Sequence, residues 1–176
     1  IFSDIPEPAA VCVSPSFVET AGVALGETDI AIASVAGGFP MSQTYVEVKA
    51  LECAMVEENG ADEIDIVMNL GAFLAENYDA TVAEIEIIRG EIDSDTTLKV
   101  IIETGELPDL SAVRRASLLA MSAGADFVKT STGFGPSGAT ESDVKLMRRV
   151  VGKKMGVKAA GGIRTREDAE KMINAG

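Results

Sequence analysis

The chain of 176 residues contains no histidine and only two cysteines. The absence of histidine excludes Ser-His-Asp and Cys-His hydrolases, HExxH metalloproteases and His-ligated metal sites. Cys12 and Cys53 form no CxxC pair, so we expect neither a zinc site nor a disulfide framework, and a reducing, cytoplasmic setting fits best. Any chemistry must use Lys, Asp, Glu, Cys, Ser, Thr or Tyr.

Basic residues are also few. Fifteen Lys and Arg face twenty-eight Asp and Glu, which gives a net charge of −13. This charge repels nucleic acid and anionic membranes, so we expect neither as a partner. No apolar run approaches the roughly 18 residues of a membrane span, and the start, IFSDIPEPAA, is acidic where a signal peptide is basic.

Hydrophobic residues make up 47% of the chain, enough for the core of one globular domain spanning residues 1–176. Short β-rich runs alternate with longer helical patterns. The expected strands are 9–13, 29–35, 63–67, 98–102, 126–130 and 156–160. The expected helices are 17–25, 44–59, 80–92, 110–123, 142–151 and 166–175, the last two with capping-box spacing at Thr140 and Thr165. The strands are apolar enough to be buried on both faces of a parallel sheet.

This βα alternation predicts an α/β fold. A complete (β/α)8 TIM barrel usually needs about 250 residues. Six βα units therefore suit a truncated barrel that lacks its first and last strands, and an open, doubly wound six-stranded sheet is the alternative. The chain begins with Ile1 and stops at Gly176, directly after a helical pattern, so we expect it to be a piece of a longer protein.

Charged residues late in buried strands are candidates for chemistry, because ligands of parallel α/β folds bind beyond the carboxyl ends of the strands. Asp65, Glu103, Lys129 and Lys158 meet this description. If Lys129 and Lys158 share one cavity, burial and like charge would lower a lysine pKa from about 10.4 by about three units and produce a neutral amine. Such an amine forms Schiff bases. The alternative is that both lysines lie at exposed strand edges and extend into water.

Small and hydroxylated residues follow both lysines. Thr130 to Gly133 come after the first, and Gly161 and Gly162, with Arg164 close behind, come after the second. Glycines allow a backbone to approach a ligand closely, and N–H groups at a helix start bind phosphate. The alternative is that these glycines serve turn geometry alone.

Five segments together resemble the deoxyribose-phosphate aldolases, a family of class I aldolases. They are VCVSPSFV (11–18), DEIDIVMNLGAF (62–73), KVIIETGEL (99–107), VKTSTGFG (128–135) and VKAAGGIRT (157–165). The resemblance implies a (β/α)8 barrel that cleaves 2-deoxy-D-ribose 5-phosphate to acetaldehyde and D-glyceraldehyde 3-phosphate. It implies no metal and no organic cofactor, small sugar-phosphate and aldehyde substrates, and a homodimer.

The same resemblance assigns roles to individual residues. Lys129 would be the Schiff-base nucleophile, Lys158 would lower its pKa and help to relay protons, and Asp65 would be the general acid/base. The substrate and its phosphate would lie near a further set of positions, namely Thr130, Gly133, Gly161, Gly162 and Arg164. Cys12 matches a cysteine beside the family's active site, with a small buried apolar residue as the alternative.

Departures from the family pattern set the remaining expectations. An N-terminal strand with an aspartate motif and a C-terminal strand with a Gly-Ser-Ser phosphate motif are absent, so we expect an active parent protein and a weakly active or inactive segment. Met41-Ser42 stands where the family has a small residue and Gly. We expect Glu103 to orient Lys129 or fix a loop. We expect Lys99, at the start of its strand, to lie at the end of the barrel that serves stability and not catalysis.

Two rival functions stay open at this point. One is another barrel enzyme that acts on a sugar phosphate, either by isomerisation or by an aldol reaction with a different donor. The other is a catalytically incompetent barrel fragment in which Lys129 is an ordinary lysine.

Overall fold

Six parallel strands form one curled sheet in the computed structural model, which describes residues 7–176. Residues 1–6, which include part of the acidic start that speaks against a signal peptide, lie outside the described residues. The strands follow chain order and are β1 (Ala10–Val13), β2 (Ala31–Val35), β3 (Glu63–Val67), β4 (Thr97–Ile101), β5 (Phe127–Lys129) and β6 (Gly156–Lys158). Sequential order with parallel pairing is the topology of a barrel wall, and the doubly wound alternative is excluded.

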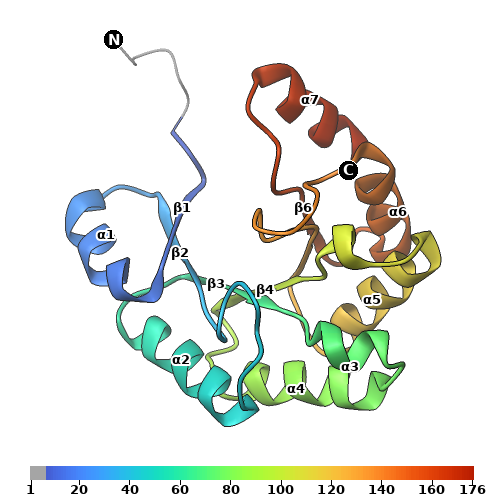
Figure 1. The fold of residues 1–176 in the computed structure, drawn as a ribbon. Helices are drawn as coiled ribbons and strands as arrows, with labels where there is room; N and C mark the ends of the chain where they lie inside the picture. The colour runs from blue at the N-terminus through green and yellow to red at the C-terminus, as the bar shows by residue number, and fades with distance from the viewer. Residues whose placement is uncertain (1–6) are drawn as a thin grey trace.

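Helices cover the outside of this curl, and the inside is left to the strands (Figure 1). They are α1 (Val18–Leu25), α2 (Val46–Glu58), α3 (Leu70–Leu74), α4 (Tyr78–Gly90), α5 (Leu110–Ser122), α6 (Glu141–Val151) and α7 (Arg166–Ala175). Two short 3-10 turns, Pro15–Phe17 and Thr104–Glu106, follow β1 and β4. Within residues 7–176 no helix is both long and apolar enough to span a bilayer.

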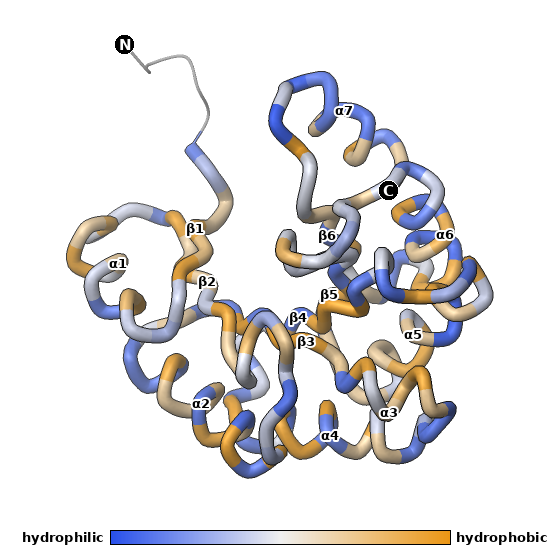
Figure 2. Tube along the Cα trace, viewed as in Figure 1, coloured by the Kyte–Doolittle hydropathy of each residue, from blue (hydrophilic) through white to orange (hydrophobic). Residues whose placement is uncertain are grey.

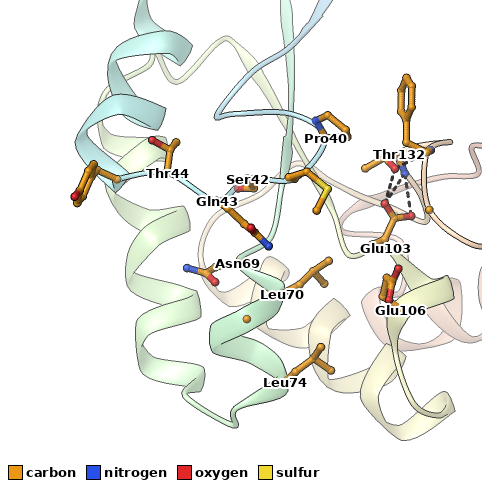
Figure 3. Close-up of a pocket in the computed structure, with 15 residues that line it drawn as sticks. Pro40, Ser42, Gln43, Thr44, Asn69, Leu70, Leu74, Glu103, Glu106 and Thr132 are labelled. Atoms are coloured by element: carbon orange, nitrogen blue, oxygen red, sulfur yellow. Dashed lines mark hydrogen bonds between the residues drawn. The ribbon is translucent and has the colours of Figure 1, made fainter.

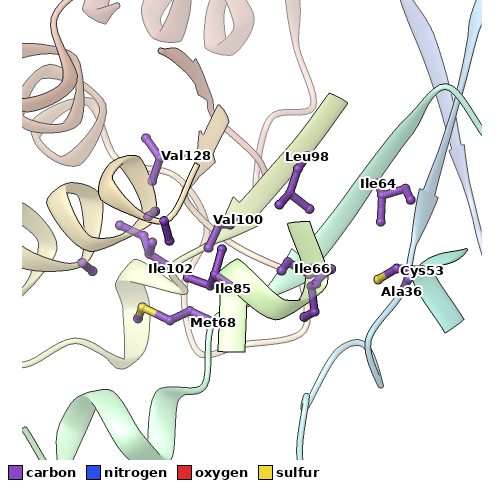
Figure 4. Packing of buried hydrophobic residues seen from close by; sticks show 14 of the residues in the cluster. Ala36, Cys53, Ile64, Ile66, Met68, Ile85, Leu98, Val100, Ile102 and Val128 are labelled. Carbon is purple, nitrogen blue, oxygen red and sulfur yellow. The ribbon is translucent and has the colours of Figure 1, made fainter. Parts of the chain in front are cut away.

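The core lies between the outer face of the sheet and the helices (Figure 4). Side chains alternate along a strand, so Ile64 and Ile66 of β3 point outward and are 0% and 1% exposed. They meet Ile85 and Ile88 of α4 in the same buried cluster. Complete burial of such a side chain contributes roughly 1.5–3 kcal/mol, so this layer fixes the strands that carry the inner face. In Figure 2 the hydrophobic stretches run along the strands, and the hydrophilic ones lie mainly on the outer helices.

The expected strands and helices are confirmed to within about two residues at their ends, with two differences. Helix α3 was not expected, because the predicted helix began at residue 80. Its start is marked by the Asn69 side chain, which accepts a hydrogen bond from the N–H of Ala72. The outer strands β1 and β6 are only partly buried, so the expectation of burial on both faces is wrong for them. Within the described residues each has one strand neighbour instead of two.

Both expected helix-start signals are present, in different degrees. Thr165 and Asp168 form a complete capping box at α7, with the threonine hydroxyl accepting from the Asp168 N–H and the carboxylate accepting from the Thr165 N–H. At α6 the Thr140 hydroxyl also accepts from the Asp143 N–H but donates to the Asp143 carboxylate. These caps begin the helices that follow β5 and β6 and thereby define the loops after the two lysines.

Candidate active site

Five charged side chains gather on the inner face of the curled sheet. Asp65 of β3 is at the centre, with its Oδ2 at 2.5 Å from Lys129 Nζ and 3.4 Å from Lys158 Nζ. Its Oδ1 lies 2.8 Å from Lys99 Nζ, which is also 2.6 Å from Glu63 Oε2. We call Glu63, Asp65, Lys99, Lys129 and Lys158 the inner cluster.

Strand register brings this cluster together. Lys129 and Lys158 are the last residues of β5 and β6 and are directly paired, as are Asp65 of β3 and Lys99 of β4. Paired residues on neighbouring strands point to the same face, so all four side chains enter the interior. The sequence prediction that Asp65, Lys129 and Lys158 converge there is confirmed by these distances. The alternative of an exposed strand edge is wrong for Lys129, whereas Lys158 lies on the outer strand β6 and is partly exposed.

Burial makes these charges interact strongly. Asp65 is 0% exposed and Lys129 is 6% exposed, whereas a third of the Lys158 side chain reaches solvent. Burial by itself raises the pKa of Asp65, but the charges of Lys129, Lys99 and Lys158 outweigh it and hold the pKa below its usual value. Asp65 is therefore an ionised carboxylate at neutral pH, and it accepts hydrogen bonds from three amines.

Lys99 corrects the sequence interpretation. We expected it near the start of its strand to lie at the stability end of the barrel, away from the chemistry. It is instead 2% exposed and bound to Asp65. Its strand is staggered so that Lys99 lies opposite Asp65, and Ile101 opposite Lys129. The signal that could have identified Lys99 is the i, i+2 spacing of Glu63 and Asp65, which puts two carboxylates on one face of the neighbouring strand.

Cys12 of β1 is exposed, so the alternative of a small buried apolar residue is wrong. It pairs with Ala33 of β2, which places it on the inner face. Although Cys12 is exposed, the surrounding inner face partly desolvates its thiol and raises its pKa. The negative charge of Asp65 raises this pKa further, against the opposing charges of the lysines. Cys12 therefore borders the inner cluster as a thiol and not as a thiolate.

The predicted binding residues differ in their placement. Thr130 is 0% exposed, and its hydroxyl donates to the Ala160 carbonyl and accepts from the Ala160 N–H. It therefore joins the ends of β5 and β6, and its contact with the substrate stays a prediction. Arg164 is exposed, and its backbone N–H donates to Asp168.

Glycines allow the two loops after the lysines to touch. A Cβ at Gly138 would lie 2.2 Å from the Gly161 carbonyl oxygen, so no other residue fits there without movement. Gly161 and Gly162 have φ of 81° and 79°, a region that disfavours side chains, and Gly162 faces open space. Gly133, in the first loop, also has positive φ, at 91°, and open space beside it. The three predicted phosphate-binding glycines thus lie in loops that meet beyond the ends of β5 and β6.

Glu103 fixes the first of these loops, as one of its two sequence interpretations predicted. It is 4% exposed, and its carboxylate accepts hydrogen bonds from the N–H and the hydroxyl of Thr132. Its backbone has φ of 48°, a left-handed conformation that costs energy for a non-glycine residue. Phe134, in the same loop, meets Phe39 edge to face with ring centroids 5.7 Å apart.

A cavity of about 830 Å³ lies between the loops that follow β2, β3, β4 and β5 (Figure 3). Its polar wall includes Ser42, Gln43, Glu103 and Glu106, and it contains no basic side chain, so it is unsuited to a phosphate. The inner-cluster lysines do not line it. Ser42 has φ of 53° and donates to the Val67 carbonyl at 2.9 Å, which explains how a serine replaces the expected glycine in this loop.

The inner cluster holds three amines for two carboxylates. A surplus amine in a buried site can lose its proton and act as a nucleophile, and the adjacent carboxylate and amines can move protons. Within residues 7–176 no group of three Cys, Asp or Glu side chains is placed to hold a metal ion. What the described residues offer is a buried amine, Lys129, in contact with an ionised carboxylate and close to a second amine that reaches solvent.

Comparisons with known proteins identify aldolases as relatives of this chain. The family model "DeoC/LacD family aldolase" matches residues 5–175. The deoxyribose-phosphate aldolase of Aciduliprofundum boonei is 52% identical over 168 residues, which cover 95% of this chain and 75% of the relative. A solved structure described as "QR15, an Aldolase" is 40% identical, with a TM-score of 0.89 over 96% of this chain and 74% of that one. The tetrameric deoxyribose phosphate aldolase from Aeropyrum pernix is 31% identical, with a TM-score of 0.82 over 94% of this chain and 69% of that one.

Proposed function

The chain belongs to the DeoC/LacD aldolase family, and from this premise we propose that it is a deoxyribose-phosphate aldolase that works through an imine on Lys129. The reaction is the reversible cleavage of 2-deoxy-D-ribose 5-phosphate to acetaldehyde and D-glyceraldehyde 3-phosphate, which makes the protein a lyase. The observation that carries the mechanism is the contact of Lys129, buried at the end of β5, with Asp65 and a second lysine-bearing strand. We infer a place in the breakdown of deoxynucleosides, in the cytoplasm.

The reaction begins at the substrate aldehyde. The neutral amine of Lys129 attacks C1 of the open-chain sugar, and the resulting carbinolamine loses water to give a protonated imine. This iminium ion accepts the electron pair of the C2–C3 bond when the C3 hydroxyl loses its proton. Glyceraldehyde 3-phosphate then leaves, and an enamine of two carbons stays on Lys129.

Asp65 and Lys158 are the proton carriers. Asp65 Oδ2 contacts the amines of Lys129 and Lys158. A proton can therefore pass through this carboxylate between Lys158, which reaches solvent, and the two-carbon fragment bound to Lys129. Protonation of the enamine at its terminal carbon and hydrolysis release acetaldehyde and restore the Lys129 amine. General acid–base catalysis of this kind typically contributes about 10²–10⁴-fold in rate.

The phosphate is assigned to the loops beyond β5 and β6. Gly133, Gly161 and Gly162 have backbones open to close approach, and Arg164 lies exposed nearby in sequence. The cavity of about 830 Å³ is the less suitable place, because its charged wall is Glu103 and Glu106. The mechanism uses neither a metal nor an organic cofactor, and its partners are small sugar phosphates and aldehydes. We propose a homodimer as the assembly.

Acetaldehyde production from 2-deoxyribose 5-phosphate tests this function. The chain and its Lys129→Leu variant are compared at equal concentration, with acetaldehyde reduced by alcohol dehydrogenase and NADH oxidation recorded. Because the segment is expected to be weakly active at most, we expect slow NADH oxidation with the unmodified chain and none above background with the variant. Equal rates in the two proteins, or release of a product other than acetaldehyde, would refute the proposal.

A further inference from the structure

We propose that Lys99 is a positioning residue that holds the Asp65 carboxylate with one oxygen turned toward Lys129 and Lys158. The inference rests on the proposed function, because it concerns the proton transfers at the Lys129 imine. The family resemblance assigned no catalytic role to Lys99. It reaches the site because strand register places it opposite Asp65.

The two oxygens of Asp65 have separate partners. Oδ1 is bound by Lys99 Nζ at 2.8 Å, while Oδ2 faces Lys129 Nζ at 2.5 Å and Lys158 Nζ at 3.4 Å. A carboxylate rotates broadly about its last torsion unless its neighbours fix it. The Lys99 contact prevents this rotation from the side opposite the reacting amines.

Lys99 is itself held in place by a second carboxylate. Glu63 Oε2 lies 2.6 Å from Lys99 Nζ, and the Glu63 side chain is 22% exposed. Lys99 is therefore a bridge between two acids of one strand, with its stem buried and its ammonium shared. Loss of Lys99 leaves Glu63 with access to water. Asp65, at 0% exposure, then keeps Lys129 and Lys158 as its ion-pair partners among residues 7–176.

Within residues 7–176, five charged or titratable groups surround Asp65. They are Lys99 of β4, Lys129 of β5, Lys158 of β6, Cys12 of β1 and, on its own strand, Glu63. Removal of Lys99 takes away one of three cations that favour ionised Asp65. Protonated Asp65 cannot accept a proton from the imine, so proton transfer will fail at a higher pH than in the unmodified chain.

Hydrogen–deuterium exchange at the methyl group of acetaldehyde measures this proton transfer directly. The chain, Lys99→Met and Lys99→Met/Glu63→Gln are incubated with acetaldehyde in D₂O from pH 5 to 9, and exchange is followed by NMR. The double variant leaves no unpaired Glu63 charge and so controls for loss of stability. Borohydride trapping of the Lys129 imine counts the competent sites in each sample.

We expect both variants to trap the imine within about twofold of the unmodified chain, and to exchange at least about tenfold more slowly per trapped site. The acid limb of their exchange profile should move upward by about one pH unit. An unchanged exchange rate per site and an unchanged acid limb would overturn the role of Lys99 and leave the proposed function standing. Failure of the unmodified chain to trap acetaldehyde on Lys129 would overturn this inference and the proposed function together.

Discussion

Two buried lysine clusters lie on opposite faces of the same sheet, and they differ in charge balance. The outer cluster consists of Lys49 of α2, Glu84 of α4 and Asn69, which begins α3. Lys49 is 1% exposed and lies 2.6 Å from Glu84 Oε1, while the Asn69 amide donates to Glu84 Oε2 at 3.0 Å. One cation faces one anion, and the neutral amide occupies the second carboxylate oxygen.

The inner cluster has three amines for two carboxylates, and one of those amines, Lys158, reaches solvent. The outer cluster has no surplus charge to release and joins helices. Burial therefore does not distinguish Lys129, the proposed nucleophile, since Lys49 is more deeply buried. The surplus of amines and the path to solvent are what make the inner cluster suited to chemistry.

Replacement of Lys129 should have the largest effect on activity and little effect on stability. Lys129→Leu removes the nucleophile, so retro-aldol activity should fall at least about a thousandfold. It leaves two amines, Lys99 and Lys158, for the two carboxylates of the inner cluster, so the free energy of unfolding in urea should change by no more than about 1 kcal/mol. A large loss of stability would mean that the inner cluster is structural in the way the outer one is.

Asp65→Asn should lower both activity and stability. Proton transfer loses its carrier, which predicts a loss of about 10²–10⁴-fold in turnover. Three amines lose their shared anion, which should cost about 3 kcal/mol at neutral pH.

The stability cost of Asp65→Asn should depend on pH. The folded-state pKa of Asp65 is lowered by its three lysines despite its burial, so the ionised carboxylate stabilises the fold above its ordinary pKa of about 3.9. That stabilisation is lost as pH falls through the folded-state value. The difference in unfolding free energy between the two proteins should therefore shrink below about pH 4, and a constant difference would contradict this reasoning.

Lys49→Met tests the outer cluster. It leaves Glu84 mostly buried without a cation, which should cost about 3 kcal/mol of stability. Turnover per folded molecule should stay within about twofold. Lys49→Met/Glu84→Gln, which removes both charges, should recover most of the stability. A loss of turnover at full folding, measured by circular dichroism on the same sample, would show that the two clusters are coupled.

An exposed ion pair provides the baseline for both clusters. Lys145 and Glu141 form an i, i+4 pair on α6 with each side chain about half exposed. Water screens such pairs, so Lys145→Gln should leave the melting temperature and the turnover unchanged within error. A melting-temperature loss as large as that of Lys49→Met would show that burial does not set the scale of these effects.

Much of the fold followed from the sequence because its signals are local. Short apolar runs alternate with helical patterns, and these runs and the capping threonines predict the strands and helices. Charged residues within the apolar runs indicated Asp65, Lys129 and Lys158. Helix α3 was missed because five residues carry no helical periodicity. No pattern in the sequence indicates that the Thr130 hydroxyl is hydrogen-bonded to Ala160.

The lysines show the limit of such reasoning most clearly. Lys99 was placed away from the chemistry because its position in the strand was judged alone, whereas strand stagger and a long side chain bring its amine to Asp65. The burial of Lys49 was not foreseen either. Its partner Glu84 is 35 residues away on another helix, and no pattern within either helix predicts their contact.

The most direct test of the account is the site of imine formation. The chain is incubated with acetaldehyde and borohydride, its intact mass is measured, and peptide mapping locates the adduct, with Lys129→Leu as the control. The account predicts one two-carbon adduct on Lys129, none on the more deeply buried Lys49, and none in the control. Labelling spread over several lysines, or a Lys129 without adduct, would contradict the claim that the inner cluster is a Schiff-base site.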